Sequence, residues 1–141
     1  MIYRVAKLSD VEDIIDLHKE SFPGEYANAA NQVENKNHRV YIAHDEKAVG
    51  YIIFQAIEGE AEIYFFAVKN ELRGQGIGQN LFEFAVNELK KEKFTKISLE
   101  VRESNMAARR IYENCGFKNV GTRIRYYTDN MEDAIIYVWE G

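Results

Sequence analysis

The sequence predicts an α/β domain in which helices cover both faces of a mixed, mostly antiparallel sheet of six to seven strands. Three strand-like segments between residues 40 and 68 are separated only by short polar turns, a pattern typical of an antiparallel meander. The third segment is followed by a glycine-rich loop, a helical pattern and a further strand, which predicts a parallel crossover. We expect residues 1–141 to form a single domain around one core.

Composition and charge argue against several classes of function. The single Cys115 rules out an intramolecular disulfide, and three scattered histidines make a metal site unexpected. A net charge of −5 argues against general nucleic-acid binding. No apolar run approaches the ~20 residues that span a membrane, and the N-terminus lacks the pattern of a signal peptide. We therefore expect a cytoplasmic protein that binds no metal, no nucleic acid and no membrane.

The N-terminal third is predicted as a strand, a helix and a polar segment. Ile2 to Lys7 alternates apolar and polar residues, as in a strand. Ser9 can cap the following helix, and the side chain of Glu12, three residues later, can accept the backbone N–H of Ser9, as in a capping box. Apolar residues at helical spacing continue to Phe22, where the helix is expected to end. Residues 25–37 are polar and rich in Asn, and they predict a short helix or a loop.

Strand and helix patterns alternate through the rest of the chain. Strands are expected where apolar, aromatic and β-branched residues predominate or alternate with polar ones, and helices where apolar residues recur every three to four positions. Gly116 is a natural end for the last helix, because glycine adopts the left-handed conformation that closes many helices. The expected strands are 40–44, 48–57, 61–68, 96–102, 117–125 and 134–140, and the expected helices run from 76 to 92 and from 104 or 105 to 116.

The loop after the strand 61–68 has the features of an anion-binding site. Glycines at three alternate positions allow backbone N–H groups to turn toward one point, and the helix start adds partial positive charge. A nucleoside-triphosphate loop would end in Gly-Lys-Ser/Thr, but Gln79 and Asn80 follow the last glycine. The third glycine of a dinucleotide loop is missing too, since Gln79 or Leu81 stands at its position. A glycine-rich surface turn without a ligand is the alternative. The glycines are Gly74, Gly76 and Gly78.

Two groups of residues resemble a known family. The pattern Arg/Gln-x-x-Gly-x-Gly after a strand that ends in Val68 resembles the loop that holds the pyrophosphate of acetyl-coenzyme A in the GNAT acetyltransferases. The ribosomal-protein-alanine N-acetyltransferases of that superfamily are similar over roughly the C-terminal half, in Leu99-Glu100-Val101-Arg102-Glu103-Ser104-Asn105-Met106-Ala107-Ala108, Tyr112, Gly116-Phe117, Arg125-Tyr126-Tyr127 and Glu132-Asp133-Ala134.

This resemblance implies the GNAT fold, with a splay between the fourth and fifth strands, and acetyl-coenzyme A as cosubstrate without a metal. A splay past Val68 would leave backbone N–H and C=O groups unpaired, and the two amides of a pantetheine arm can pair with them like an extra strand. The residues expected at acetyl-coenzyme A are Phe66, Ala67, Val68, Arg73, Gly74, Gln75, Gly76, Ile77, Gly78, Gln79 and Asn105.

The resemblance also implies Glu100 as the proton acceptor and Tyr112 as the proton donor to coenzyme A. Acetyl transfer to an amine needs both groups, because the amine must lose a proton and the departing thiolate is helped by gaining one. Asn105 and Tyr112 lie seven residues apart, within about 20° of one helix face. The alternatives are purely structural: an exposed strand carboxylate for Glu100, a core tyrosine for Tyr112 and a helix cap for Asn105. Glu60 and Glu62 are rival bases.

We expect the substrate to be a protein N-terminal α-amine, of a ribosomal protein by resemblance. Its ordinary pKa of about 7.7–8.0 lies well below the ~10.4 of lysine, so a carboxylate base removes its proton more easily. A GNAT enzyme for a small-molecule amine and a non-catalytic module that binds acetyl-coenzyme A are the alternatives. Aromatic and acidic side chains are expected to line the peptide groove, namely Glu25, Tyr26, Tyr126, Tyr127, Glu132 and Asp133.

Overall fold

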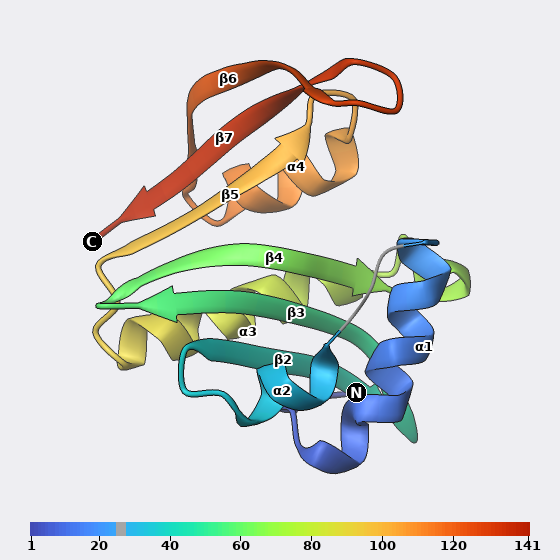
Figure 1. Cartoon of the computed structure of the whole chain (residues 1–141). Coiled ribbons are helices and arrows are strands. Elements are labelled where there is room, and N and C mark those ends of the chain that lie inside the picture. The colour runs from blue at the N-terminus through green and yellow to red at the C-terminus, as the bar shows by residue number, and fades with distance from the viewer. Residues whose placement is uncertain (25–27) are drawn as a thin grey trace.

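The described residues, 1–24 and 28–141 of the computed structural model, form a sheet of seven strands: β1 (Ile2–Val5), β2 (His38–Asp45), β3 (Lys47–Ile57), β4 (Glu60–Val68), β5 (Lys96–Arg102), β6 (Lys118–Tyr127) and β7 (Glu132–Glu140). Their order in the sheet is β1-β2-β3-β4-β5-β7-β6 (Figure 1). Neighbouring strands are antiparallel except β4 and β5, which are parallel. The predicted mixed, mostly antiparallel sheet is confirmed.

Helices cover both faces of this sheet, as predicted (Figure 1). Two of them pack on one face, here called the α1/α2 face, and two on the opposite α3/α4 face. The central strand β3 is buried on both faces from Ala48 to Phe54, which explains its unbroken apolar run. The described helices are α1 (Val11–Ser21), α2 (Ala29–Glu34), α3 (Ile77–Lys91) and α4 (Met106–Asn114), with 3-10 turns at η1 (Leu8–Asp10) and η2 (Asn70–Leu72).

The parallel strands β4 and β5 separate soon after they begin. They pair only at Glu60, Ala61 and Glu62, and β5 continues with β7 alone as its neighbour. A β-bulge at Tyr64 lies directly after the last pair, because Ile53 opposes Phe65 while the next β3 residue opposes Ile63. Bulges bend a strand and increase its twist. The splay is therefore confirmed, but it begins after Glu62 and not past Val68 (Figure 1).

The start of α1 differs from the predicted capping box. The side chain of Asp10, and not that of Ser9, accepts a backbone hydrogen bond, from the N–H of Lys7 at 2.7 Å. Asp10 also forms a two-point ion pair with Arg4, at 2.8 and 3.0 Å. Burial alone would raise the pKa of Asp10, but the bonds from Arg4 and Lys7 hold it below its ordinary value. The reason is the 3-10 turn η1, which precedes α1, so that Asp10 and not Ser9 is the residue directly before the helix.

The end of β5 leads directly into α4. Asn105 caps this helix, since its Oδ1 accepts the N–H of Ala108 at 3.2 Å. Gly116 follows the helix with φ +85°, the conformation expected at a helix end. No helix in the described part of the chain combines the length and the apolar character needed to cross a membrane.

Candidate active site

The mouth of the splay is an open strand edge. From Ile63 to Val68, β4 pairs with β3 on one side, but it has no described strand on the side of β5. Backbone groups on such an edge are unsatisfied unless water or a ligand pairs with them. Phe66 points to the α3/α4 face and contacts Phe82, while Ala67 is buried on the α1/α2 face. The site is therefore open between two well-packed layers.

The glycine loop lies directly after β4. Gly74 and Gly76 have φ of +81° and +83°, and a Cβ at either position would meet nothing within 4 Å. Gly76 precedes α3, and its carbonyl accepts the N–H of Asn80 at 3.0 Å. The N–H groups of Ile77 to Gln79 therefore precede the first intrahelical bond, as at any helix start. Gly78 serves close packing, since a Cβ there would lie 3.3 Å from Ile111 Cδ1 of α4.

The polar side chains of the loop are turned toward the protein. Arg73 donates from Nε to the carbonyl of Val68 at 3.2 Å and from Nη2 to Ser21 Oγ at 3.4 Å. Gln79 donates to Glu83 at 2.8 Å and to Cys115 Sγ at 3.4 Å. Gln75 is exposed. The loop therefore offers mainly backbone N–H groups to a ligand.

Glu100 lies on β5 beside the splay, on the α1/α2 face. Its side chain is 19% exposed, and Oε1 accepts a hydrogen bond from Arg123 Nε at 2.8 Å. The other oxygen, Oε2, is buried and has no hydrogen-bond partner among the described residues. The carboxylate is thus held on one oxygen and free to accept on the other.

Two tyrosines at the end of β6 flank Glu100. The nearby Glu100 carboxylate raises the pKa of Tyr126, because it favours the neutral hydroxyl over the anion. Burial raises the pKa of Tyr127, whose ring lies 4.1 Å from the guanidinium of Arg102 and contacts the ring of Tyr126 edge-on. The two rings therefore form an aromatic wall next to the carboxylate.

Tyr112 of α4 approaches from the opposite face. Its residue is 6% exposed, and its ring packs on Phe82, Tyr137 and Phe66 at centroid distances of 5.1, 5.9 and 6.5 Å. Burial raises its pKa well above the ordinary value, and Tyr127 adds to the rise. Side chains alternate along β5, so Leu99 and Val101 pack beneath α4 while Glu100 points to the α1/α2 face. The predicted base and acid thus flank the splay from its two faces.

Asn105 and Tyr112 do not share one environment, although their spacing is helical. Asn105 is an exposed helix cap and Tyr112 is a core residue that also contacts the splay. Asn105 therefore acts as a helix cap and Tyr112 as a core residue, as the structural alternatives predicted. Neither role excludes contact with a ligand.

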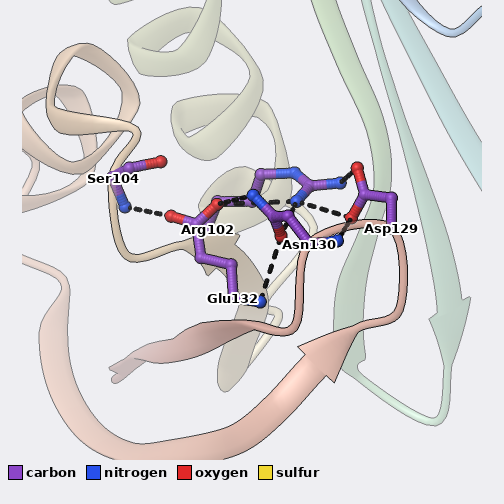
Figure 2. A network of polar contacts seen from close by, with 5 residues as sticks. All are labelled: Arg102, Ser104, Asp129, Asn130 and Glu132. Atoms are coloured by element: carbon purple, nitrogen blue, oxygen red, sulfur yellow. Dashed lines mark hydrogen bonds and ion pairs between the residues drawn. The ribbon is translucent and has the colours of Figure 1, made fainter.

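Two of the acidic residues predicted for the substrate groove are bound within the protein. Glu132 accepts the N–H of Ser104 at 2.6 Å and faces Arg102 (Figure 2). Arg102 in turn donates two hydrogen bonds to Asp129, at 3.1 and 3.0 Å. Asp133 accepts the N–H of Arg125 at 2.8 Å. These contacts tie the connection between β6 and β7 to the end of β5, and they hold Arg102 beneath Tyr127.

The remaining predicted residues lie at different places. Glu25 and Tyr26 fall outside the described residues. Glu60 lies where β4 and β5 pair and faces Lys96 at 3.9 Å, so it is remote from the open end. Glu62 is the last paired residue of β4, and its charge adds to the raised pKa of Tyr126, as that of Glu100 does. Among the described residues, no three His, Cys, Asp or Glu side chains group as metal ligands.

Arg102 and Arg123 are two site residues that the sequence analysis did not single out. Arg123 of β6 lies opposite Ala134 of β7, and Ala134 lies opposite Arg102 of β5, so the three form one row across the sheet. The spacing of residues within one strand does not predict such a row. Predicting it requires the register between the strands.

Comparison with known proteins identifies the family of the chain. The family model described as "Acetyltransferase (GNAT) family" matches residues 11–117. The [ribosomal protein bS18]-alanine N-acetyltransferase of Escherichia coli K12 is 36% identical over 125 residues, which cover 86% of this chain and 84% of the relative.

Solved structures also match over nearly the whole chain. The crystal structure of the ribosomal-protein-S18-alanine N-acetyltransferase from Escherichia coli has a TM-score of 0.88 at 28% identity, covering 99% of this chain and 92% of that one. A mutant spermidine N-acetyltransferase from Vibrio cholerae has a TM-score of 0.84 at 19% identity, covering 99% and 95%, and shares the fold alone. The chain is thus an acetyltransferase that belongs to the GNAT family.

Proposed function

We propose that the protein transfers an acetyl group from acetyl-coenzyme A to the N-terminal α-amine of a protein, with a ribosomal protein as the favoured substrate. The observation that carries the reaction is the splay between β4 and β5, which has Glu100 on one face and Tyr112 on the other. The names of the relatives that match over most of the chain support the substrate. The cytoplasmic location expected from the sequence fits this substrate.

Binding of acetyl-coenzyme A is supported by the open backbone of the site. Bound acetyl-coenzyme A supplies the acetyl group and leaves as a thiol. The free edge of β4 at Phe66, Ala67 and Val68 can pair with the amides of its pantetheine arm. The loop from Gly74 to Gln79 presents N–H groups and a helix start to the pyrophosphate.

Three groups of the chain carry the proposed chemistry. Glu100 takes a proton from the amine through Oε2, directly or through a water. A backbone N–H of β4 donates to the carbonyl oxygen and stabilises the negative charge that develops there. Tyr112 then gives its hydroxyl proton to the leaving sulfur. The hydroxyl is protonated at neutral pH, as that of an ordinary tyrosine also is, and the place of Tyr112 at the splay supports this role.

The groups around Glu100 support a peptide as the acceptor. Tyr126 and Tyr127 offer an aromatic wall next to the carboxylate. Glu132 and Asp133 remain predicted as groove residues, but their internal hydrogen bonds indicate that they act by holding this wall. An acceptor that enters from the α1/α2 face would meet Glu100 first, while the thiol leaves toward Tyr112.

The choice of substrate is tested with two peptides of one basic sequence. One carries a free N-terminal alanine and no lysine, and the other is blocked at its N-terminus and has one internal lysine. We expect faster acetylation of the free terminus, because its amine loses a proton more readily. The measurement is kcat/KM by mass spectrometry of the product. Faster acetylation of the blocked peptide contradicts the proposal, and turnover of spermidine or an amino sugar but of neither peptide favours a small-molecule enzyme.

Cofactor binding is tested by Gly76→Asp, which introduces an anion where the pyrophosphate is expected. We expect affinity for acetyl-coenzyme A to fall by about tenfold or more in calorimetry, because like charges repel at the helix start. Gly59→Asp is the matched control, since Gly59 has φ +81° and open space around it, in the turn between β3 and β4. Equal affinity of the wild type and Gly76→Asp contradicts the loop assignment.

A further inference from the structure

The ion pair between Arg123 and Glu100 crosses the strand that separates them. Arg123 lies on β6 and Glu100 on β5, with β7 between the two strands. Ala134 is the β7 residue directly opposite Arg123, and it is fully buried. Directly opposed residues share one face of a sheet. Glu100 lies opposite Ile136, the next β7 residue on the same face, so Arg123 Nε reaches Glu100 Oε1 diagonally across β7, at 2.8 Å.

This contact makes the two oxygens of Glu100 different. Oε1 is occupied by Arg123, and Oε2 is buried without a partner among the described residues. A buried acceptor without a donor is costly, so a water or an amine that donates to Oε2 is favoured. A carboxylate whose first oxygen is held also has fewer orientations open to it than a free one.

We propose that Arg123 is a positioning residue for the reaction, which holds Glu100 by Oε1 so that Oε2 accepts the proton of the substrate amine. This inference rests on the proposed role of Glu100 as the base. Arg123 acts through Glu100 and need not touch the substrate. Its guanidinium also lies 5.8 Å from the ring of Tyr126, so it joins the base to the aromatic wall.

A purely structural role for Arg123 is poorly supported. Its side chain is 56% exposed, and exposed ion pairs contribute little to stability. No second hydrogen bond joins Arg123 to any other side chain in the described part of the chain. Its removal should therefore leave the fold intact and act on the reaction.

A double-mutant cycle in the full chain tests the proposal. The enzymes are wild type, Arg123→Ala, Glu100→Gln and the double variant, assayed with the free-terminus alanine peptide. In the wild-type background we expect Arg123→Ala to lower kcat by about 10- to 100-fold, because a displaced base is a poor base. In the Glu100→Gln background it should have almost no effect, since no base remains to be positioned. Binding of acetyl-coenzyme A should be unchanged throughout.

Two further variants make the test specific. Arg123→Lys keeps the charge and one donor, and it should recover part of the lost rate. Lys118→Ala removes a positive charge from an exposed position of the same strand and should keep the wild-type rate. Thermal melting of every variant checks that the fold is kept.

The outcomes separate this proposal from the proposed function. If Arg123→Ala lowers kcat equally in both backgrounds, or raises it in the wild-type background, Arg123 does not position the base, and the role of Glu100 stands. If Glu100→Gln alone keeps the wild-type rate, the proposed base is wrong and the positioning role falls with it.

Discussion

Glu100→Gln is expected to lower kcat by about 10²–10⁴-fold near pH 6.5, and by much less near pH 9. Glutamine keeps the size of the side chain and can still face Arg123, but it cannot accept a proton. An α-amine has an ordinary pKa of about 7.7–8.0, so at pH 9 most of the substrate has already lost its proton in solution. The loss therefore shrinks as pH rises. Steady-state rates across this pH range measure it.

Two comparisons make this result decisive. Glu103→Gln changes an exposed carboxylate three residues further on and should keep the wild-type rate at every pH. Glu62→Gln tests the rival base, because Glu62 also faces Tyr126. A wild-type rate for Glu100→Gln at all pH values, together with a loss for Glu62→Gln, assigns the base to β4.

Tyr112→Phe should lower kcat by about 10²–10⁴-fold while affinity for acetyl-coenzyme A and thermal stability stay close to those of the wild type. The substitution keeps the ring and its contacts with Phe82 and Tyr137. It removes only the hydroxyl, which is the proposed proton donor. The leaving sulfur then departs without a proton donor. Single-turnover rates measure the chemical step, and calorimetry measures binding.

Tyr137→Phe is the matched control for this variant. Tyr137 is also buried and packs against Tyr112, but its hydroxyl donates to Glu113 at 2.5 Å and accepts from Arg109 at 3.1 Å. These bonds fasten α4 to β7, so Tyr137→Phe should lower the melting temperature and leave kcat nearly unchanged. If both variants lower kcat alike, the effect of Tyr112 is one of packing and not of proton transfer.

Local pattern was sufficient where an element is decided by its own residues. The strand 96–102 was predicted with the bounds that β5 has, because its apolar and polar residues alternate without interruption. The helix after the glycine loop also agrees within one residue at each end, at Ile77–Lys91. The strand 40–44 was predicted too short, since pairing with β3 extends β2 to His38 and Asp45. The ends of a strand depend on its partner, which no local pattern contains.

Some features of the candidate site are also visible in local sequence, whereas others depend on the fold. The glycine loop, the strand before it and the order of Glu100 and Tyr112 along the chain could be recognised from motifs alone. The contacts of Glu132 and Asp133 could not, because both accept backbone N–H groups from segments that the fold brings to them. The early start of the splay, after Glu62, depends on a bulge that exists only between paired strands.

The sequence by itself determined the family and the order of the elements, because hydrophobic period, turn residues and motif spacing are local properties. It also predicted which residues carry acetyl transfer. Only the tertiary structure decided that Glu100 and Tyr112 approach from opposite faces and that Arg123 reaches Glu100 across β7. The placements of Glu100 and Arg123 follow from the register of β5, β7 and β6, and a shift of one residue would turn either side chain to the other face. That of Tyr112 follows from the packing of α4 on the sheet. Register is a long-range property that depends on packing of the whole sheet.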